Sequence, residues 1–375
     1  MQATVLFNNP APIRKIETEG IKYAGSKLKL IQYINNIVYK LAPKSILDGF
    51  SGTTRVSQAF AQAGYQVISN DIAIWSYHFA QCYLKADRPR KYYQDIISHL
   101  NSMPEKQGWF SLNYGAAPEN LNIRHKKPWQ IHNTRKLDAI REEIDRLELD
   151  DIDKSVALTS LMLALDEVDN TLGHYSSYLK AWSPRSYKAM FLKVPALLAP
   201  DGRHNVSCGD IFDLIASDKV YDVAYFDPPY GSNNEKMPPS RVRYGAYYHV
   251  WTTVCKNDQP KLFGKANRRV DTSDKISSSI FEEFRKDASG KFLAVNAIER
   301  LIRETRANHI ILSYSTGGRA TSEQLHEAIR LNGRVKDVIE VDYKKNVMAN
   351  MRRTNDWIRE TEKTHKELIF VIEKT

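Results

Sequence analysis

The chain has 375 residues and a net charge of +10, from 54 lysine and arginine residues against 44 aspartate and glutamate residues. This length allows one large α/β domain carrying a smaller inserted one. No run reaches the roughly 18 uncharged apolar residues of a membrane span, and residues 1–14 lack the features of an export signal, so we expect no membrane partner.

The three cysteines, Cys82, Cys208 and Cys255, are far apart and are not spaced as metal ligands. The odd number and wide spacing of the cysteines predict that the protein has no disulfide and no metal site, and that it lies in the reducing cytoplasm. The positive net charge creates a field that attracts a polyanion, and nucleic acid is the usual one. Composition alone does not decide this, because many basic proteins bind no nucleic acid.

Residues 1–86 alternate strand-like apolar runs with helical periodicity, as βαβ units do. Strands are predicted at Lys44–Asp48 and Gln66–Asn70, and helices at Ser26–Lys40 and Thr54–Ala63. This stretch therefore predicts the beginning of a doubly wound sheet.

Residues 87–203 differ from the first stretch, because they are strongly polar and rich in Tyr, Trp, Lys and Arg. Helical patterns cover Thr134–Leu147 and Asp153–Ala164, and β-branched runs are few. We interpret this stretch as a mostly helical insertion.

From residue 204 the alternation resumes, and a helix is predicted at Ser322–Leu331. The predicted strands are Val220–Phe226, Ile310–Tyr314, Val338–Tyr343 and Glu367–Ile372. Between them, Ser232–Gly290 is polar and is predicted to form long loops with a short helix around Ile280–Arg285. We therefore expect an α/β, Rossmann-like sheet that is split in sequence and whole in space.

The most specific motif is Asp227-Pro228-Pro229-Tyr230, which follows the apolar run Val223–Phe226. The carboxyl ends of strands form the ligand crevice of an open α/β sheet. If the Asp227 carboxylate and the Pro228 carbonyl each accept one hydrogen of an exocyclic amine, its nitrogen is pushed toward a tetrahedral geometry that can attack a methyl sulfonium. Two prolines hold both acceptors in place, and Tyr230 can stack on an extruded base. The alternative is an ordinary proline turn with a solvated aspartate.

A second motif, Ile46–Thr53, runs from a strand through a small-residue turn into a helix. Gly49 and Gly52 allow the backbone to approach a cofactor, and the GxGxxG spacing of dinucleotide-binding proteins is missing. Asp71 ends the next predicted strand, where a carboxylate can accept from a ribose hydroxyl pair. The alternative for Asp71 is the N-cap of a helix beginning at Ile72, and both roles are compatible.

Four segments in this order resemble the Dam-like family of adenine-specific DNA methyltransferases. The segments are Lys22–Lys27, Asp48–Gly52, Gly209–Phe212 and Asp227–Tyr230. The resemblance implies a Rossmann-like catalytic domain with a helical target-recognition domain inserted between its cofactor half and its catalytic half. It thus implies a cofactor half at residues 1–86, a recognition insertion at 87–203 and a catalytic half at 204–375. It also implies S-adenosyl-L-methionine as cofactor and double-stranded DNA as partner.

Carried over by position, the resemblance implies a set of cofactor contacts. Tyr23 and Lys27 would touch the methionine end, and Asp71 would hold the ribose. The pocket lining would comprise Asp48, Phe50 and Gly52, and the adenine contacts would come from Asp210 and Ile211. The alternatives are a solvated helix residue for Lys27 and a turn or cap residue for Asp210.

Candidate DNA contacts lie in Gly173–Arg185, where aromatic residues alternate with cations. We take Tyr175, Lys180 and Arg185 from this stretch, together with Arg268 and Arg269, as the DNA-binding candidates. The alternatives are inward-packed aromatic residues and solvated cations. Ser313–Gly318, at the end of a predicted strand, is a candidate wall of the target-base pocket.

These patterns predict direct methyl transfer to adenine in double-stranded DNA, without a metal or a covalent enzyme intermediate. A partner restriction endonuclease is compatible with this hypothesis. Three alternatives stay open at this level: an amino-directed cytosine methyltransferase, a ribosomal RNA adenine or guanine methyltransferase, and a non-catalytic DNA-binding module.

Overall fold

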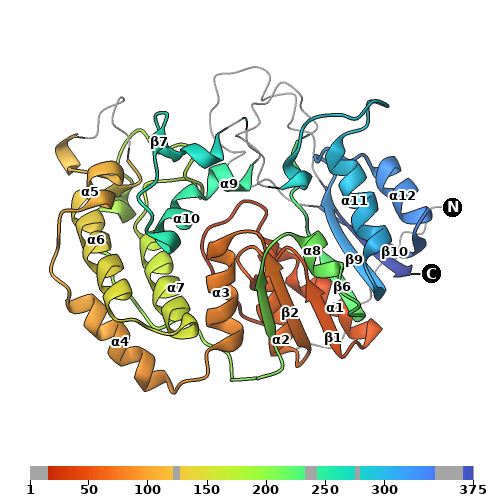
Figure 1. Ribbon diagram of the computed structural model, residues 1–375, viewed down its shortest axis with the longest axis horizontal. Coiled ribbons are helices and arrows are strands. Elements are labelled where there is room, and N and C mark those ends of the chain that lie inside the picture. The colour runs from red at the N-terminus through yellow and green to blue at the C-terminus, as the bar shows by residue number, and fades with distance from the viewer. Residues whose placement is uncertain are drawn as a thin grey trace.

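The computed structural model describes residues 16–120, 127–232, 243–273, 275, 279–342 and 366–374. Its centre is a seven-stranded sheet of order β10-β11-β9-β6-β1-β2-β5 (Figure 1). The strands are β1 Ser45–Asp48, β2 Gln66–Asp71, β5 Asn205–Cys208, β6 Tyr221–Phe226, β9 Ala307–Ser315, β10 Gly333–Asp342 and β11 Lys366–Lys374. All neighbours pair in parallel except β11, which is antiparallel to both β9 and β10.

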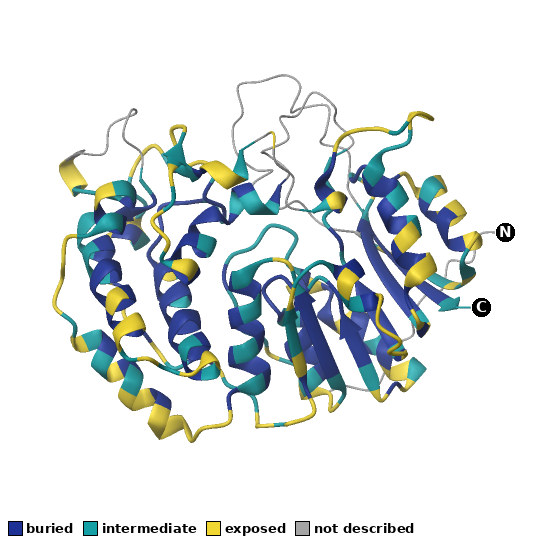
Figure 2. Cartoon of the chain, viewed as in Figure 1, coloured by how far each residue is buried: buried dark blue, intermediate teal, exposed yellow. Residues whose placement is uncertain are grey.

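Helices cover both faces of the sheet because successive residues of its central strands point to opposite sides. Ile46 and Val223 face one hydrophobic cluster, whereas Leu47 and Ala224 face the other. The first cluster is covered by α1 Ile31–Leu41, α2 Arg55–Gln62 and α3 Ile74–Lys85, and the second by α8 Ile211–Ile215, α11 Leu293–Glu304 and α12 Ser322–Arg330. The inner strands β1, β2, β6, β9 and β11 are accordingly mostly buried, whereas the edge strands β5 and β10 are partly exposed (Figure 2).

A third hydrophobic cluster forms a helical layer beside the sheet, on the left in Figure 1. Its helices are α4 Arg90–Ser102, α5 Trp109–Tyr114, α6 Ile131–Arg146, α7 Asp151–Glu167, α9 Tyr244–Tyr247 and α10 His249–Lys256. Four short strands lie outside the central sheet: β3 Gly115–Ala116, β4 Trp129–Gln130, β7 Leu262–Phe263 and β8 Arg268–Arg269. The described residues also form short 3-10 helices at Lys27–Lys29, Pro118–Asn120, Pro184–Tyr187, Val270–Thr272 and Ile280–Glu282. Helix α3 belongs to both parts, since Phe79 packs into the helical cluster and Leu84 into the sheet cluster.

The structure confirms the predicted α/β, Rossmann-like fold and each predicted strand to within a few residues. Strand β5 was not predicted, because its four residues lie at a half-exposed sheet edge and carry no clear alternation. The prediction of loops with one short helix for Ser232–Gly290 was wrong over its middle part. There α10 buries Val250, Trp251 and Val254 in the helical cluster, so two separate stretches of chain build the helical layer. None of the helices in the described ranges is long and apolar enough to cross a membrane.

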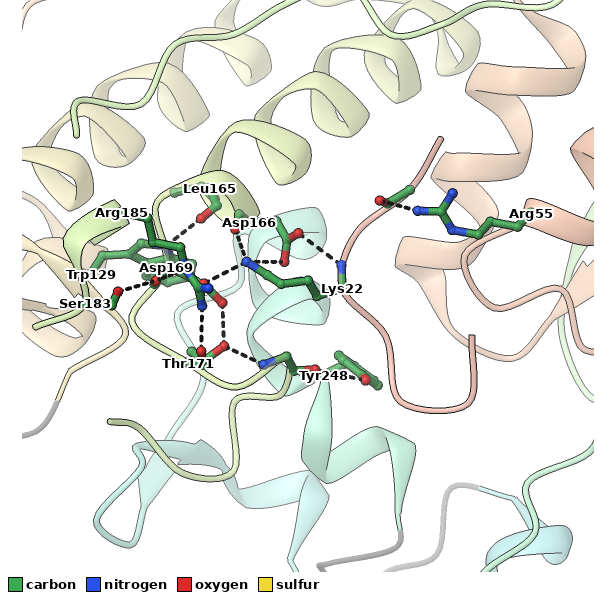
Figure 3. Close-up of polar contacts among 12 residues, drawn as sticks. Lys22, Arg55, Trp129, Leu165, Asp166, Asp169, Thr171, Ser183, Arg185 and Tyr248 are labelled. Carbon is green, nitrogen blue, oxygen red and sulfur yellow. Dashed lines mark hydrogen bonds and ion pairs between the residues drawn. The ribbon is translucent and has the colours of Figure 1, made fainter. Parts of the chain in front are cut away.

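A buried ion cluster joins the helical layer to the segment that precedes the sheet (Figure 3). The Asp169 carboxylate, just after α7, lies 2.9 Å from Lys22 Nζ and 2.5 Å from an Arg185 nitrogen. It also accepts a hydrogen bond from the Thr171 hydroxyl, and the Lys22 backbone N–H donates to Asp166 at 3.0 Å. The cluster therefore ties the end of α7 and the loop after it to residue 22.

We expect Asp169→Ala to destabilise the fold by about 2–3 kcal/mol, because Lys22 and Arg185 lose their common anion. This loss is smaller than for a fully buried pair, since water can reach both cations. The control is Glu167→Ala at the last residue of α7, which removes an exposed ion pair with Lys193 and should cost less than about 0.5 kcal/mol. Urea denaturation measures both, and equal losses would contradict the assigned role of Asp169.

Candidate active site

A cavity of about 450 Å³ opens at the carboxyl ends of β1, β2, β5 and β6. Its walls come from residues within 23–27, 48–56, 70–75, 208–211, 225–229 and 244–282. This volume lies in the range of about 300–1,000 Å³ that is usual for pockets holding a small molecule or cofactor. The sheet therefore brings the motifs of both halves of the sequence to a single pocket.

Backbone hydrogen bonds extend the sheet into the turns that line the cavity. Gly49 N donates to Tyr225 O, Ser51 N to Asn70 O and Gly209 N to Asp71 O, each at 3.0 Å. Gly52 has φ of +49°, a conformation that glycine adopts without steric cost. The turn after β1 is thereby held between β2 and β6 before α2 begins.

Asp71 lies at the end of β2 with its carboxylate held by two backbone donors. It accepts from Gly52 N at 2.8 Å and from Ala73 N at 2.9 Å, while burial raises its pKa. Asp71 thus holds the turn before α3 and lines the cavity. The N-cap role considered from the sequence is not observed, because the N-cap residue of α3 is Ala73 and this helix has no side-chain cap.

Asp48 is 1% exposed, and only one of its carboxylate oxygens is satisfied. Ser57 Oγ donates to Oδ2 at 2.6 Å, whereas the buried Oδ1 has no partner among the described residues. Burial raises the pKa of Asp48 to about 7, against the opposing hydrogen bond from Ser57. A buried acceptor without a donor at a cavity wall indicates a site for a hydrogen-bonding, cationic ligand group.

The other predicted cofactor residues also line the cavity. Phe50 packs edge-on against Phe281 at a ring distance of 5.0 Å. Asp210 caps α8 by accepting from Phe212 N at 2.9 Å, and the neighbouring Ile211 is buried in the sheet core. Asp210 therefore has the cap role considered from the sequence while facing the same space.

The Asp-Pro-Pro-Tyr loop meets Lys27 in a buried polar cluster. Lys27 Nζ lies 2.9 Å from Asp227 Oδ2 and 3.2 Å from Glu367 Oε1, and it donates to the Tyr230 hydroxyl at 2.6 Å. The Tyr230 hydroxyl is also within hydrogen-bonding reach of both carboxylates. Lys27 lines the cavity, but its ammonium group faces the catalytic loop. Sequence patterns did not indicate Glu367, which lies far from every motif in the chain.

Burial raises the pKa of Asp227 to about 6, with Lys27 lowering it and Glu367 raising it. Burial lowers the pKa of Lys27, but Asp227 and Glu367 outweigh burial, so this pKa lies above its ordinary value. At neutral pH the cluster therefore holds an ionised Asp227 beside a protonated Lys27.

The other residues of the Asp-Pro-Pro-Tyr loop are held by contacts with neighbouring parts of the protein. Pro229 lines the cavity, whereas Pro228 is buried and is not among the lining residues. The Tyr230 ring packs against Tyr314 at 4.8 Å, and its backbone carbonyl accepts from Arg319 N at 2.9 Å. Ser313, from the predicted base-pocket wall, is buried and donates to Glu367 at 2.7 Å.

Tyr23, a predicted cofactor contact, belongs to an aromatic group whose other members, Tyr244 and Tyr248, the motifs did not indicate. Tyr23 stacks on Tyr244 at 5.2 Å and on Tyr248 at 4.7 Å, and Tyr23 and Tyr244 line the cavity. The four-residue spacing of Tyr244 and Tyr248 places both on one helical face, a pattern that could have indicated this group.

The five DNA-binding candidates have different surroundings. Tyr175 is 1% exposed with its ring 4.9 Å from that of Trp251, and Arg269 is 3% exposed between Asp258 and Asp271. Arg185 belongs to the Asp169 cluster. The structure gives these three side chains packing and ion-pairing roles inside the protein, in place of the DNA contacts expected from the sequence.

The remaining two candidates lie closer to solvent. Lys180 is exposed. Arg268 is half-buried, with its guanidinium 4.6 Å from the centre of the Phe263 ring. These two side chains therefore stay candidates for phosphate contact.

The sheet is parallel except for one strand, and its strand ends share a cavity with an Asp-Pro-Pro-Tyr loop. This combination defines a Rossmann-like methyltransferase that acts on an amine. Residues 23–316 match the family model of the D12 class N6 adenine-specific DNA methyltransferases, and the chain belongs to this family. This finding confirms the predicted activity class and favours adenine over the cytosine and RNA alternatives.

Two modification enzymes illustrate the similarity. The chain is 27% identical over 376 residues to the modification methylase StsI of Streptococcus sanguinis, covering 94% of this chain and 52% of that protein. It is 27% identical over 368 residues to the type II methyltransferase M.NlaIII of Neisseria lactamica, covering 95% of this chain and 100% of that protein. The chain thus spans about half the length of the first relative and all of the second.

We expect Gly49→Ala to destabilise the fold by about 1–3 kcal/mol, because a Cβ atom there would lie 2.6 Å from the Phe226 ring. The displaced ring directly precedes Asp227, so catalysis should also be impaired. Gly209→Ala is the matched control, since Gly209 lines the same cavity and a Cβ atom there meets nothing within 4 Å. Thermal unfolding of both variants without cofactor checks this, and equal stabilities would contradict it.

Proposed function

We propose that the chain transfers a methyl group from S-adenosyl-L-methionine to the exocyclic amine of adenine in double-stranded DNA. The observation that carries this proposal is the single cavity that joins the Asp227 loop to the glycine turn and Asp71. The hydrogen-bond acceptor for the target amine and the site for a nucleoside cofactor thus lie in the same cavity. Family membership supports the same reaction.

The residues present fit this cofactor. Asp71 provides a carboxylate for ribose hydroxyls, and the unsatisfied Asp48 Oδ1 can accept from an ammonium group. Acidic side chains outnumber basic ones in the cavity lining, which suits a ligand that carries positive charge. The acidic residues are Asp48, Asp71, Asp210, Asp227, Asp271 and Glu282, and the basic ones are Lys27, Arg55, Lys256 and Arg269. We propose that Tyr23 and Phe50 border this ligand with Gly52, and that Asp210 and Ile211 border its adenine.

The protein prepares the amine for attack. When bound, the cofactor supplies an electrophilic methyl group on a positively charged sulfur. The ionised Asp227 accepts one hydrogen of the adenine amine and the Pro228 carbonyl accepts the other, which localises the nitrogen lone pair. The Lys27 ammonium group, 2.9 Å from Asp227 Oδ2, fixes the position of the Asp227 carboxylate, so little reorganisation accompanies transfer.

The target base must leave the DNA stack to reach this cavity. In our proposal the cavity aromatic Tyr244 gives the extruded base a stacking surface, together with Tyr230 and Pro229 of the catalytic loop. Phosphate contacts are proposed for Lys180 and Arg268, within the field of a chain whose net charge is +10.

The relatives named as modification methylase and type II methyltransferase suggest a restriction-modification context. We propose that a cognate restriction endonuclease accompanies this chain. We also propose a cytoplasmic location, in keeping with the unpaired cysteines Cys82, Cys208 and Cys255.

The central test is Asp227→Ala, which removes the amine acceptor. We expect methyl transfer to unmethylated genomic DNA to fall by about 10²–10³-fold, while S-adenosylhomocysteine still binds. Mass spectrometry of the nucleosides should detect N6-methyladenine with the wild-type protein. The control is Asp218→Ala at an exposed surface position. Retention of more than about a tenth of wild-type activity by folded Asp227→Ala would contradict the assignment.

A second test uses the raised pKa of Asp48. As pH rises through about 7, Asp48 ionises and should attract the cationic cofactor, so affinity should increase between pH 5.5 and 7.5. In Asp48→Asn, the increase in cofactor affinity between pH 5.5 and 7.5 should be smaller by about three- to tenfold. The remaining increase would come from other carboxylates. Calorimetric titration at each pH gives the affinities. Identical pH dependence in both proteins would exclude Asp48 as the source.

A further inference from the structure

Glu367 reaches the active site from the far end of the chain because β11 runs against the other strands. The parallel strands contribute residues after their carboxyl ends, whereas β11 contributes its second residue, close to its beginning. There Glu367 pairs with Ser315 of β9 and is 5% exposed.

A single oxygen of Glu367 lies close to three donor groups. Oε1 accepts from Ser313 Oγ at 2.7 Å and lies 3.2 Å from Lys27 Nζ. It is also within reach of the Tyr230 hydroxyl, whose one proton can go either to Glu367 or to Asp227. On the other side of the same ammonium group, Asp227 Oδ2 lies at 2.9 Å. Lys27 is therefore shared between two carboxylates, of which only Asp227 borders the cavity.

Hydrogen bonding alone does not require a charge at position 367. A glutamine oxygen could accept from Ser313 and Tyr230 equally well, and burying a carboxylate carries a desolvation cost. The negative charge of Glu367 competes with Asp227 for the Lys27 ammonium group. Without it, the ammonium group would pair with Asp227 alone and weaken that carboxylate as an acceptor.

We propose that Glu367 is a positioning residue for methyl transfer, which draws Lys27 and the Tyr230 hydroxyl toward itself and so keeps Asp227 available to the adenine amine. This inference rests on the proposed function. It concerns the strength of one acceptor and requires no contact between Glu367 and either substrate.

The charges around Asp227 make the proposal testable by the sign of a pH shift. The titratable groups near Asp227 are Lys27, Glu367, Tyr230, Asp48, Tyr23, Tyr225 and Tyr244. Burial raises the pKa of each tyrosine, which keeps it neutral. Lys27 and Glu367 therefore act in opposite directions, while Asp48 stays the same in the variants compared.

The experiment measures single-turnover methyl transfer to unmethylated genomic DNA between pH 5 and 9. In Glu367→Gln the plateau rate should fall by about 10–100-fold, because Asp227 becomes a weaker acceptor. The acid limb, expected near pH 6 for the wild type, should move to lower pH because a neighbouring negative charge is lost. In Lys27→Met the acid limb should move to higher pH. The dissociation constant of S-adenosylhomocysteine should stay within about twofold in Glu367→Gln.

Two controls separate this role from a structural one. Glu373→Gln changes the same residue type in β11 at a partly exposed ion pair with Lys336 and should match the wild type. Ser313→Ala removes a donor to Glu367 but leaves both charges, so its acid limb should not move. Glu367→Asp keeps the charge and should restore the wild-type acid limb, with a reduced plateau rate.

The outcomes distinguish the inference from the function on which it rests. If the wild type methylates adenine but folded Glu367→Gln keeps its rate or its acid limb, the role of Glu367 is overturned. If Glu367→Gln does not fold, the absence of an upward shift in Lys27→Met overturns it instead. A wild type that forms no N6-methyladenine overturns the proposed function itself.

Discussion

The parallel pairing of β1 between β2 and β6 is the constraint on which the active site depends. Asp48 lies opposite Ser69 on one side and Tyr225 on the other. Because this register continues as backbone hydrogen bonds beyond the strands, the turn after β1 keeps a defined position relative to Asp71 and the Asp227 loop. Sequence segments separated by more than a hundred residues consequently border one cavity.

The electrostatics of the interior and of the whole chain have opposite signs. The chain carries a net charge of +10, which favours a polyanion, whereas acidic side chains outnumber basic ones in the cavity lining and include Asp48, Asp71 and Asp227. Burial raises the pKa of all three carboxyl groups, so the protein alone stabilises their ionised forms incompletely. Lys27 supplies part of the compensating positive charge from the protein side.

The helical layer is more closely connected to the catalytic part than an independent recognition unit would be. Helix α3 contributes to both hydrophobic clusters, and Asp169 fastens Lys22 directly beside Tyr23 of the cavity wall. The predicted boundaries at residues 87 and 203 capture most of this layer but omit α9 and α10, which return to it after the catalytic loop. The segment Ser232–Gly290 was predicted to form loops because it is polar overall and because the residues that pack against it lie far away in the sequence.

The sequence by itself determined the fold class and the family, because alternating strands, a glycine turn and two prolines after Asp227 are local features whose geometry is nearly independent of context. It also indicated several residues that line the cavity, among them Asp48, Asp71 and Asp227. Only the tertiary structure decided the environment of each charge. The same composition led to an exposed Lys180 and to Arg185 and Arg269 held by buried or half-buried aspartates, since local patterns do not distinguish solvent from a buried partner. Glu367 required the complete sheet, because an antiparallel strand brings its first residues to the edge where the parallel strands end.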